Sequence, residues 1–314
     1  MIAEFAIEPR VMAQWRHFHS LHDDFGVPRG RFIARFPREW AKQVAQLAHQ
    51  LTHNKTNSPL NAKRIEEHLF SEAFKRKVVP ARRPYDPDKP WLVNATGLPE
   101  EQTFQAIIAE TTCDDHPKVL LAGEFLKDDP LYHIDTGTKI LRTAKELAAC
   151  AKPLLKVSEE LQLVDPNFKV RDHFSRPVNR FLATLEEILR LRVEMPHPLR
   201  KLELHLQRRD DQSSEATRRD FEKSLGRAIP TGHVVKVFLW SARQGGERLH
   251  PRFLLTEFGG IKYDYGLDEG EKGEQTEVAL VPDNLWKKYR QDYSESGTAF
   301  AIEPARDIFV VNGS

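Results

Sequence analysis

The sequence predicts an α/β protein in which a mixed sheet flanked by helices follows a mainly α-helical N-terminal domain. From residue 161 onward, short β-prone runs alternate with amphipathic runs of helical period, as in a sheet covered on both faces. Before residue 95, apolar residues recur at helical spacing instead. Residues 85–90 hold two prolines and two aspartates, a composition typical of turns. We therefore expect one domain over residues 1–95 and a second over residues 96–314.

Length, charge and hydropathy are those of a globular protein. The chain has 314 residues, of which 40% are apolar and 30% are charged, and its net charge is +1. No apolar run reaches the ~18 residues that a transmembrane helix needs, and the N-terminus has no signal-peptide pattern. We expect a cytoplasmic protein without membrane insertion. Cys113 and Cys150 lack CxxC spacing, which excludes a zinc ribbon built from cysteine alone.

The N-terminal domain is predicted to be basic and helical. Residues 1–95 carry 16 Lys and Arg against 10 Asp and Glu. Helices are expected near residues 11–22, 40–51 and 62–77, an arrangement compatible with a helix-turn-helix or winged-helix module. No recognition helix can be picked out within them.

A run of arginines between the first two helices is a candidate nucleic-acid contact. In one interpretation the arginines follow the phosphate backbone while Phe32 and Phe36 stack on bases. In the other, the arginines are a solvated face above two core phenylalanines. The residues concerned are Arg29, Arg31, Arg35 and Arg38.

The second domain is predicted from alternating strand and helix patterns. Strands are expected over residues 118–122, 161–164, 201–205, 233–240, 252–256, 261–265, 276–281 and 307–311, and helices over 138–155, 177–191, 214–225 and 284–293. Strands that alternate with helices predict a mixed sheet covered on both faces. In such sheets reactive residues gather at the strand ends.

Two strand ends carry candidate chemistry. His250 and Arg252 lie two residues apart at the head of an apolar strand, so their side chains point to the same face. A titratable imidazole beside a fixed cation suits a phosphate-handling site. Asp165 ends the strand that begins near residue 161, and it belongs either to such a site or simply to a β-to-α turn.

These residues resemble the phospholipase D superfamily over residues 155–314. His250-x-Arg252, then four residues and Glu257, is similar to its His-x-Lys, four residues, Asp signature. The resemblance is closer to the phospholipase D-like domain at the C-terminus of MIT-domain proteins and in bacterial relatives. The segments that carry it are Leu249-His250-Pro251-Arg252, Gly259-Gly260, Gly266-Leu267-Asp268 and Asp165-Pro166-Asn167-Phe168.

The resemblance implies a metal-independent phosphodiesterase or nuclease that needs no cofactor. His250 would attack phosphorus, Arg252 and Arg180 would hold the non-bridging oxygens, and Glu257 would orient His250. The sequence departs from the pattern, because arginine replaces lysine, glutamate replaces aspartate and the second motif is missing. The acid for the leaving oxygen would then be His205, beside Glu203 on its strand, or His250 of the partner subunit in a homodimer. His205 and His250 also have a purely structural interpretation.

A second interpretation makes the domain a catalytically degenerate binding or scaffold module, a subunit of a defence or mobile-element complex. In either case we expect nucleic acid as the partner, with a homodimer or a hetero-complex as the assembly. A third, a lipid-headgroup hydrolase, has less support because no amphipathic basic helix indicates a membrane interface. The chain has no P-loop, G-x-S-x-G or H-E-x-x-H pattern, which leaves NTPase, α/β-hydrolase and zincin chemistry unsupported.

Overall fold

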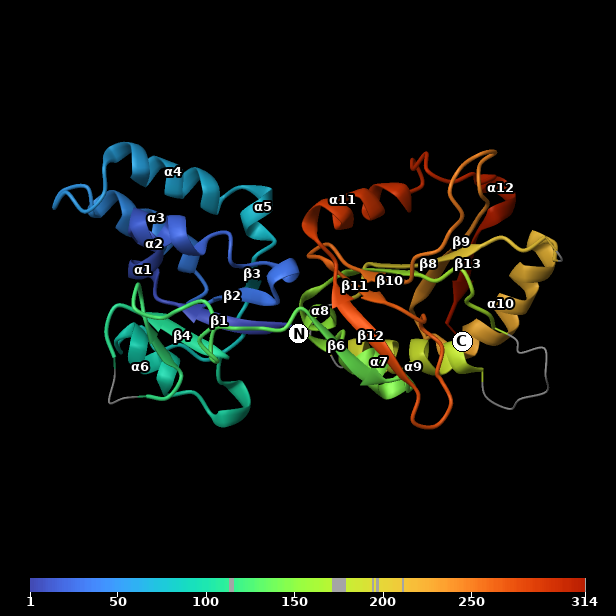
Figure 1. The fold of residues 1–314 in the computed structure, drawn as a ribbon, viewed down its shortest axis with the longest axis horizontal. Coiled ribbons are helices and arrows are strands. Elements are labelled where there is room, and N and C mark those ends of the chain that lie inside the picture. The colour runs from blue at the N-terminus through green and yellow to red at the C-terminus, as the bar shows by residue number, and fades with distance from the viewer. Residues whose placement is uncertain (113–115, 171–178, 194, 196–197, 211, 314) are drawn as a thin grey trace. The chain divides into compact units, whose positions relative to one another are not determined.

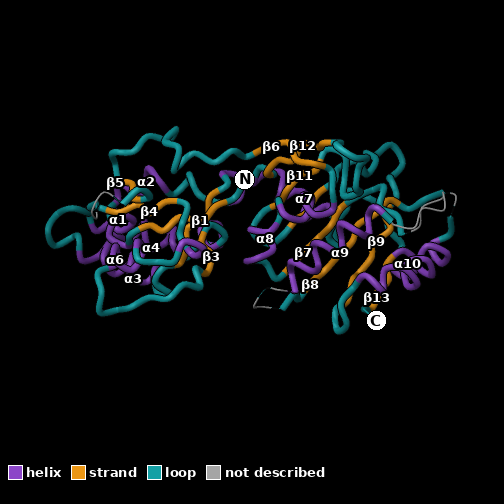
Figure 2. Tube along the Cα trace, turned by 90° about the horizontal axis from the view of Figure 1, so that it is seen from below, coloured by secondary structure: helices purple, strands orange, loops and turns teal. Residues whose placement is uncertain are grey.

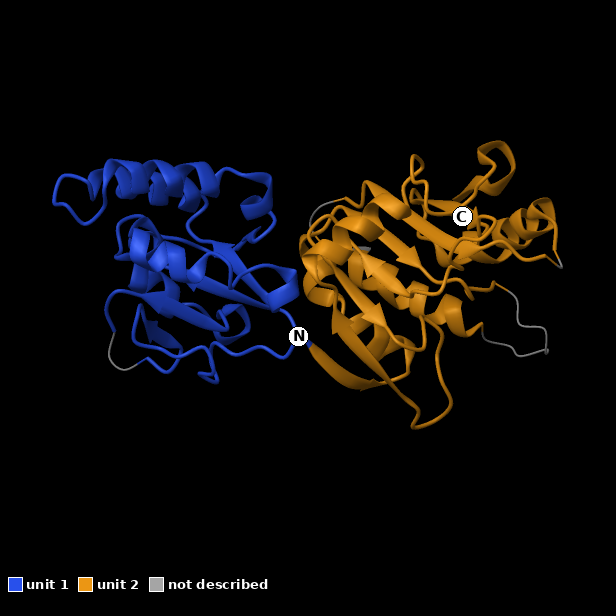
Figure 3. Cartoon of the chain, turned by 45° about the horizontal axis from the view of Figure 1, so that its top comes forward, with its two compact units in different colours: residues 1–136 blue, residues 137–314 orange. Residues whose placement is uncertain are grey.

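The computed structural model describes residues 1–112, 116–170, 179–193, 195, 198–210 and 212–313. The chain divides into two compact units, Met1–Thr136 (unit 1) and Gly137–Ser314 (unit 2) (Figure 3). The boundary thus lies about forty residues beyond the expected one. The proline- and aspartate-rich residues 85–90 form a turn inside unit 1, before helix α6 (Trp91–Thr96), because turn chemistry marks a change of chain direction and does not by itself end a domain.

Unit 1 is built on a parallel sheet, so the expected mainly helical domain is wrong. Its strands are β1 (Ala3–Ile7), β2 (Arg31–Arg35), β3 (Val78–Pro80), β4 (Ala106–Ala109) and β5 (Val119–Leu121). They are ordered β3-β2-β1-β4-β5, and every neighbouring pair is parallel. The central strands are short and buried on both faces, as in all four residues of β4, so they lack the two-residue alternation that reveals a strand.

Helices cover both faces of this sheet. They are α1 (Pro9–Ala13), α2 (Trp15–Leu21), α3 (Trp40–Gln50), α4 (Pro59–Leu69), α5 (Glu72–Lys75) and α6, with 3₁₀ turns η1 (Val27–Arg29) and η2 (Glu100–Gln102). Phe5, Ile7 and Ile33 pack with α1 to α5, while their neighbours Ala6 and Ala34 pack on the opposite side with α6. Figure 1 shows α3 and α4 on one side of the sheet and α6 on the other. Unit 1 is therefore a doubly wound α/β domain.

Unit 2 contains the mixed sheet that the sequence predicts. Its strands are β6 (Gly137–Leu141), β7 (Glu160–Val164), β8 (Lys201–Gln207), β9 (Val234–Trp240), β10 (Phe253–Leu255), β11 (Gly260–Tyr263), β12 (Gln275–Leu280) and β13 (Ile308–Asn312). The order is β13-β9-β8-β7-β10-β11-β12-β6, in which β7, β8 and β9 are parallel and the other pairs antiparallel. Figure 2 shows these strands and their helices along the chain trace.

The predicted helices of unit 2 are found with one exception, and the short last helix was not predicted. They are α7 (Ala144–Ala149), α8 (Lys152–Val157), α9 (Arg180–Val193), α10 (Ser214–Ala228), α11 (Asp283–Asp292) and α12 (Pro304–Asp307). The expected helix over 138–155 is wrong in its first part, where residues 137–141 instead pair with β12 as an edge strand. The expected start of α9 at Pro177 lies outside the described residues. Helices α7 to α10 pack together, and α11 lies across the opposite face (Figure 1).

Serine caps explain where two of the longer helices begin. The Ser58 hydroxyl accepts a hydrogen bond from the backbone N–H of Asn61 at 3.1 Å, with Pro59 at the first position of α4. The Ser213 hydroxyl accepts from the N–H of Ala216 at 3.2 Å at the start of α10. These side chains satisfy N–H groups that lack a partner within the helix, so the local sequence sets the helix start.

Candidate functional site

The chemistry-bearing residues of unit 2 lie at the edge where its parallel strands end, here called the carboxyl edge. Strands β7, β8 and β9 run parallel, so their C-terminal ends share this edge. Strand β10 runs antiparallel to β7, with Phe253 opposite Val164. The residues before β10 therefore return to the end of β7, which places His250 and Arg252 at the same edge as Asp165.

Asp165 joins two of the sequence motifs. It is 0% exposed, and its two carboxylate oxygens accept hydrogen bonds from the backbone N–H groups of Asn167 and Leu267, each at 2.9 Å. Burial raises the pKa of Asp165 to about 6, against the lowering effect of these N–H groups and of Arg252. The Asp-Pro-Asn-Phe and Gly-Leu-Asp segments thus meet through one carboxylate.

The Arg252 side chain packs against Gly266, next to the Asp165 carboxylate. A Cβ on Gly266 would lie 2.7 Å from Asp165 Oδ2 and 3.0 Å from Arg252 Cδ, and this glycine has a φ of +106°. Only glycine fits such a position. One terminal nitrogen of Arg252 donates to the carbonyl of Asp264 at 3.0 Å. Its Nε is buried and, among the described residues, has no hydrogen-bond partner. The guanidinium is therefore held at the edge while its buried Nε stays unpaired among the described residues.

His250 lies at this edge with its side chain exposed. Its neighbour Leu249 is buried in the core beneath α11 and anchors the segment. Within the described part of the chain, no hydrogen bond or ion pair holds the His250 ring. The imidazole is available to a ligand or to a second molecule.

Glu257 lies at the other end of the sheet, so it cannot orient His250 as expected. Its carboxylate accepts hydrogen bonds from the backbone N–H groups of Glu159 at 2.6 Å and Glu160 at 3.2 Å, where β7 begins. Burial raises the pKa of Glu257. The separation has a simple cause: the residues between His250 and Glu257 include β10, and an extended strand advances about 3.3 Å per residue.

His205 is enclosed in the core, which removes it as an acid for His250. It is 0% exposed, and Trp240 Nε1 donates to its Nδ1 at 3.0 Å. Its Nε2 faces Glu203 Oε2 at 3.4 Å, so the proton of the neutral ring lies on Nε2. Burial lowers the pKa of His205. Glu203 also accepts from Gln162 at 2.6 Å, and these groups form a polar network within the core.

Arg180 lies beside the loop that follows β11. One of its terminal nitrogens forms an ion pair with Glu271 at 2.6 Å, and the other contacts the carbonyl of Glu269 at 3.4 Å. Arg142 holds the same loop through Asp268 at 2.6 Å. Arg180 and Asp268 thus contribute to the order of the loop.

Besides His250 and Arg252, several cations near the carboxyl edge of unit 2 were not singled out from the sequence. Loops that leave β7, β8 and β9 or lead into β10 carry a group of basic residues that we call the basic edge. Its members are Lys169, Arg208, Arg209, Arg243, Arg248, His250 and Arg252. Arg243 and Arg248 are exposed, whereas Arg208 lies 3.7 Å from Asp307. These residues could have been found from the sequence, because each follows the end of a predicted strand or precedes the next one.

The four arginines of unit 1 do not form one surface. Arg31 is buried, and its Nε donates to the carbonyl of Tyr132 at 2.8 Å. Arg29 precedes β2 while Arg35 and Arg38 lie at its other end, and all three are exposed. Phe32 and Phe36 are each 1% exposed, so they are the core phenylalanines of the second interpretation and are not open to base stacking. Phe36 packs in the core with Ala34, on the side of β2 that faces α6.

Other features limit the chemistry of the described residues. No three His, Cys, Asp or Glu side chains there gather in a way that could hold a metal ion. No helix in the described ranges combines the length and apolar character needed to cross a membrane. Cys150 is half-buried, burial raises the pKa of its thiol to about 11, and its S–H contacts the Tyr263 hydroxyl at 3.4 Å. Cys113 lies outside the described residues.

Comparison with known proteins yields little. No protein-family model matches the chain, and no curated protein matches it. Among solved structures, the archaeal chromatin protein TrmBL2, described as showing a novel mode of DNA binding, is similar with a TM-score of 0.28 and 13% identity. The likeness covers 55% of each chain, so this chain spans only about half the length of TrmBL2. At that TM-score it carries no argument about fold or function.

Proposed function

We propose that unit 2 is a phospholipase D-like module that binds the phosphodiester backbone of nucleic acid at its basic edge without cleaving it. The observation that carries this proposal is the separation of the groups that hydrolysis requires. His250 is exposed at the carboxyl edge, Glu257 is at the opposite end of β7, and His205 is enclosed with both ring nitrogens engaged. Neither Glu257 nor His205 can therefore assist His250 in the expected mechanism, and the carboxylate oxygens of Asp165 at the same edge already accept backbone hydrogen bonds.

The charge at this edge supports binding to a polyanion. Arg243, Arg248 and His250 are exposed in the loop between β9 and β10, and Lys169 is exposed after β7. Lysine and arginine side chains bind phosphates largely without regard to sequence, and they release counterions as they do so. We therefore expect affinity that depends on salt and little on base sequence.

Binding is tested by fluorescence anisotropy of labelled single-stranded oligonucleotides at several salt concentrations. We expect Arg243→Gln/Arg248→Gln to weaken binding and to reduce the slope of log affinity against log salt by about 1.4, at ~0.7 per lost phosphate contact. Lys223→Gln/Arg227→Gln is the matched control, because these exposed residues lie in the last turns of α10, about 13–20 Å from its start at 1.5 Å per residue. Equal loss in both variants, or no binding at low salt, would overturn the proposal.

Cleavage is tested separately on plasmid and oligonucleotide in EDTA. The proposal expects no cleavage by the wild type. Cleavage that disappears in His250→Ala would overturn the non-hydrolytic proposal. A rate that then rises more steeply than the first power of protein concentration would support His250 of the partner subunit as the missing acid.

A further inference from the structure

Unit 1 contains a crevice that the proposed function of unit 2 does not use. In the order β3-β2-β1-β4-β5, the chain passes from β1 outward to β3 and then crosses back to place β4 on the other side of β1. The connections therefore leave β1 and β4 in opposite directions. In open parallel sheets, ligands bind at the carboxyl ends of the strands at this reversal point.

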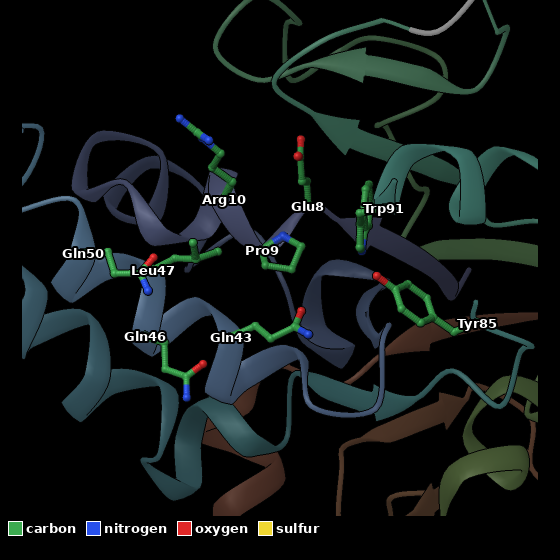
Figure 4. Close-up of a pocket in the computed structure, with 9 residues that line it drawn as sticks. All are labelled: Glu8, Pro9, Arg10, Gln43, Gln46, Leu47, Gln50, Tyr85 and Trp91. Atoms are coloured by element: carbon green, nitrogen blue, oxygen red, sulfur yellow. The ribbon is translucent and has the colours of Figure 1, made fainter. Parts of the chain in front are cut away.

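A first cavity opens at the carboxyl end of β1. Its volume is about 370 Å³, within the usual range for small-molecule sites. Figure 4 shows that it is bounded by the turn after β1, by one face of α3, and by two aromatic rings from residues 85–91. The lining residues are Glu8, Pro9, Arg10, Gln43, Gln46, Leu47, Gln50, Tyr85 and Trp91.

A second cavity adjoins it at the carboxyl ends of β2 and β3. Its volume is about 340 Å³, and Tyr85 lines both cavities. Four of its lining residues are arginines, namely Arg35, Arg38, Arg82 and Arg83. Neutral and apolar groups make up the rest of its wall. One cavity is thus amide-rich and aromatic, and its neighbour is cationic.

The aromatic wall between the cavities is fixed in place. Trp91 Nε1 donates to the carbonyl of Phe36 at 2.9 Å. The Tyr85 ring meets the Phe36 ring edge to face, with centroids 5.1 Å apart. Phe36 itself is buried in the core. A planar ligand would therefore meet rings that are already ordered, which lowers the entropic cost of binding.

The turn after β1 is unsuited to phosphate. It reads Glu8-Pro9-Arg10 and has no glycine, and α1 has only five residues, so it lacks the glycine-rich helix start that cradles a pyrophosphate. The Glu8 carboxylate accepts from the backbone N–H of Glu110 at 2.9 Å. Arg10 pairs with Glu110 at 2.9 Å. Two carboxylates at this point would repel an anion.

Two arginines of the second cavity have no carboxylate partner among the described residues. Arg83 is occupied, because it pairs with Glu4 at 2.5 Å and stacks over Phe104 at 4.2 Å. Among the described residues, Arg35 and Arg38 have no carboxylate within ion-pair distance, and the nearby Glu39 pairs with Lys42 at 2.7 Å. Two guanidinium groups are therefore available to an anion at the end of β2.

We propose that unit 1 binds a nucleoside phosphate across these two cavities. Arg35 and Arg38 hold the phosphate, and the nucleoside lies against Tyr85 and Trp91. The amides of α3 offer both donors and acceptors to the base edge. Each half of such a ligand meets the wall that complements it, whereas the reverse orientation would place phosphate on Glu8.

The test is calorimetric titration of the full chain with nucleoside mono-, di- and triphosphates of the four common bases. Inorganic phosphate, inorganic triphosphate and unphosphorylated nucleosides serve as partial probes. We expect at least one nucleotide to bind more tightly than any partial probe. Arg35→Gln/Arg38→Gln should weaken it by about tenfold or more, the size of a lost hydrogen bond to a charged group. Gln46→Ala, an exposed substitution on α3, should weaken nucleotides but not inorganic triphosphate.

Arg29→Gln is the matched control, since it removes an exposed arginine from the other end of β2. The proposal is overturned if no nucleotide binds at millimolar concentration, if inorganic triphosphate binds as tightly, or if Arg29→Gln causes the same loss. The result is separable from the nucleic-acid proposal. Arg35→Gln/Arg38→Gln should leave oligonucleotide affinity unchanged, and Arg243→Gln/Arg248→Gln should leave nucleotide affinity unchanged.

Discussion

Trp240 donates its indole N–H to Nδ1 of His205 at 3.0 Å, which fixes the tautomer of a histidine that no solvent reaches. The His205 ring stacks on the ring of Phe238, with their centroids 4.5 Å apart. A histidine in this setting orders the core beneath α11. His250 differs in being exposed on a loop, where its imidazole does not contribute to the core.

Replacing each of the two histidines by alanine should affect the free energy of unfolding very differently. His205→Ala removes a buried ring and leaves the Trp240 N–H unpaired, so we expect a loss of about 2–4 kcal/mol in the free energy of unfolding. His250→Ala should change stability by less than about 0.5 kcal/mol, as is usual for an exposed side chain. Urea unfolding measures both. Equal effects of the two substitutions would contradict the assignment of His205 to the core.

The raised pKa of Asp165 predicts a specific dependence of stability on pH. The folded state holds this proton up to about pH 6, whereas the unfolded chain releases it near its ordinary pKa of 3.8. The wild type should therefore lose stability relative to Asp165→Asn as pH rises from about 4 to about 6. The loss should be on the order of 3 kcal/mol, at about 1.4 kcal/mol per pKa unit. Urea unfolding of both proteins across this range is the measurement, and a constant difference would contradict the prediction.

The sequence predicted unit 2 well because its elements are long and bounded by clear signals. Strand β9 has seven residues, and α10 has fifteen behind a serine cap. The strand expected over residues 118–122 is found as β5, but the rest of the sheet of unit 1 was missed because β3 has only three residues and β4 is buried on both sides. Periodicity cannot distinguish such runs from short helices or loops.

The candidate site was predictable only in part, for a geometric reason. The resemblance pointed to both segments that meet at Asp165, although Leu267 lies about a hundred residues away along the chain. It also placed Glu257 beside His250, whereas β10 carries the chain from one edge of the sheet to the other between them. No sequence motif marks the cavities of unit 1. They depend on the order of the strands in the sheet, which the spacing of residues along the chain does not reveal.

Two arginines at the start of β2 should differ sharply in their effect on stability. Arg31 donates to the carbonyls of Tyr132 and Asp24, and its guanidinium lies 4.3 Å from the centroid of the Tyr132 ring. Arg31→Gln should cost about 2–4 kcal/mol in the free energy of unfolding, because buried carbonyls lose charged donors. Arg29→Gln, at an exposed position, should cost less than about 0.5 kcal/mol. Thermal or urea unfolding distinguishes them. Neither substitution should alter oligonucleotide affinity, and a loss of affinity in Arg29→Gln would show that the arginines of unit 1 bind nucleic acid.

Gly266 packs against Asp165 and Arg252, so a side chain at this position should disturb the basic edge. Gly266 and Gly273 have φ angles of +106° and +83°, so alanine at either position carries backbone strain of about 1–2 kcal/mol. At Gly273 nothing lies within 4 Å of the added methyl group, and strain is the whole effect. At Gly266 the methyl group would also meet Asp165 Oδ2 at 2.7 Å and Arg252 Cδ at 3.0 Å. Gly266→Ala should therefore lower stability more than Gly273→Ala and weaken oligonucleotide binding by displacing Arg252, whereas Gly273→Ala should bind as the wild type does. If the two variants bind equally, Arg252 does not contribute to the nucleic-acid surface.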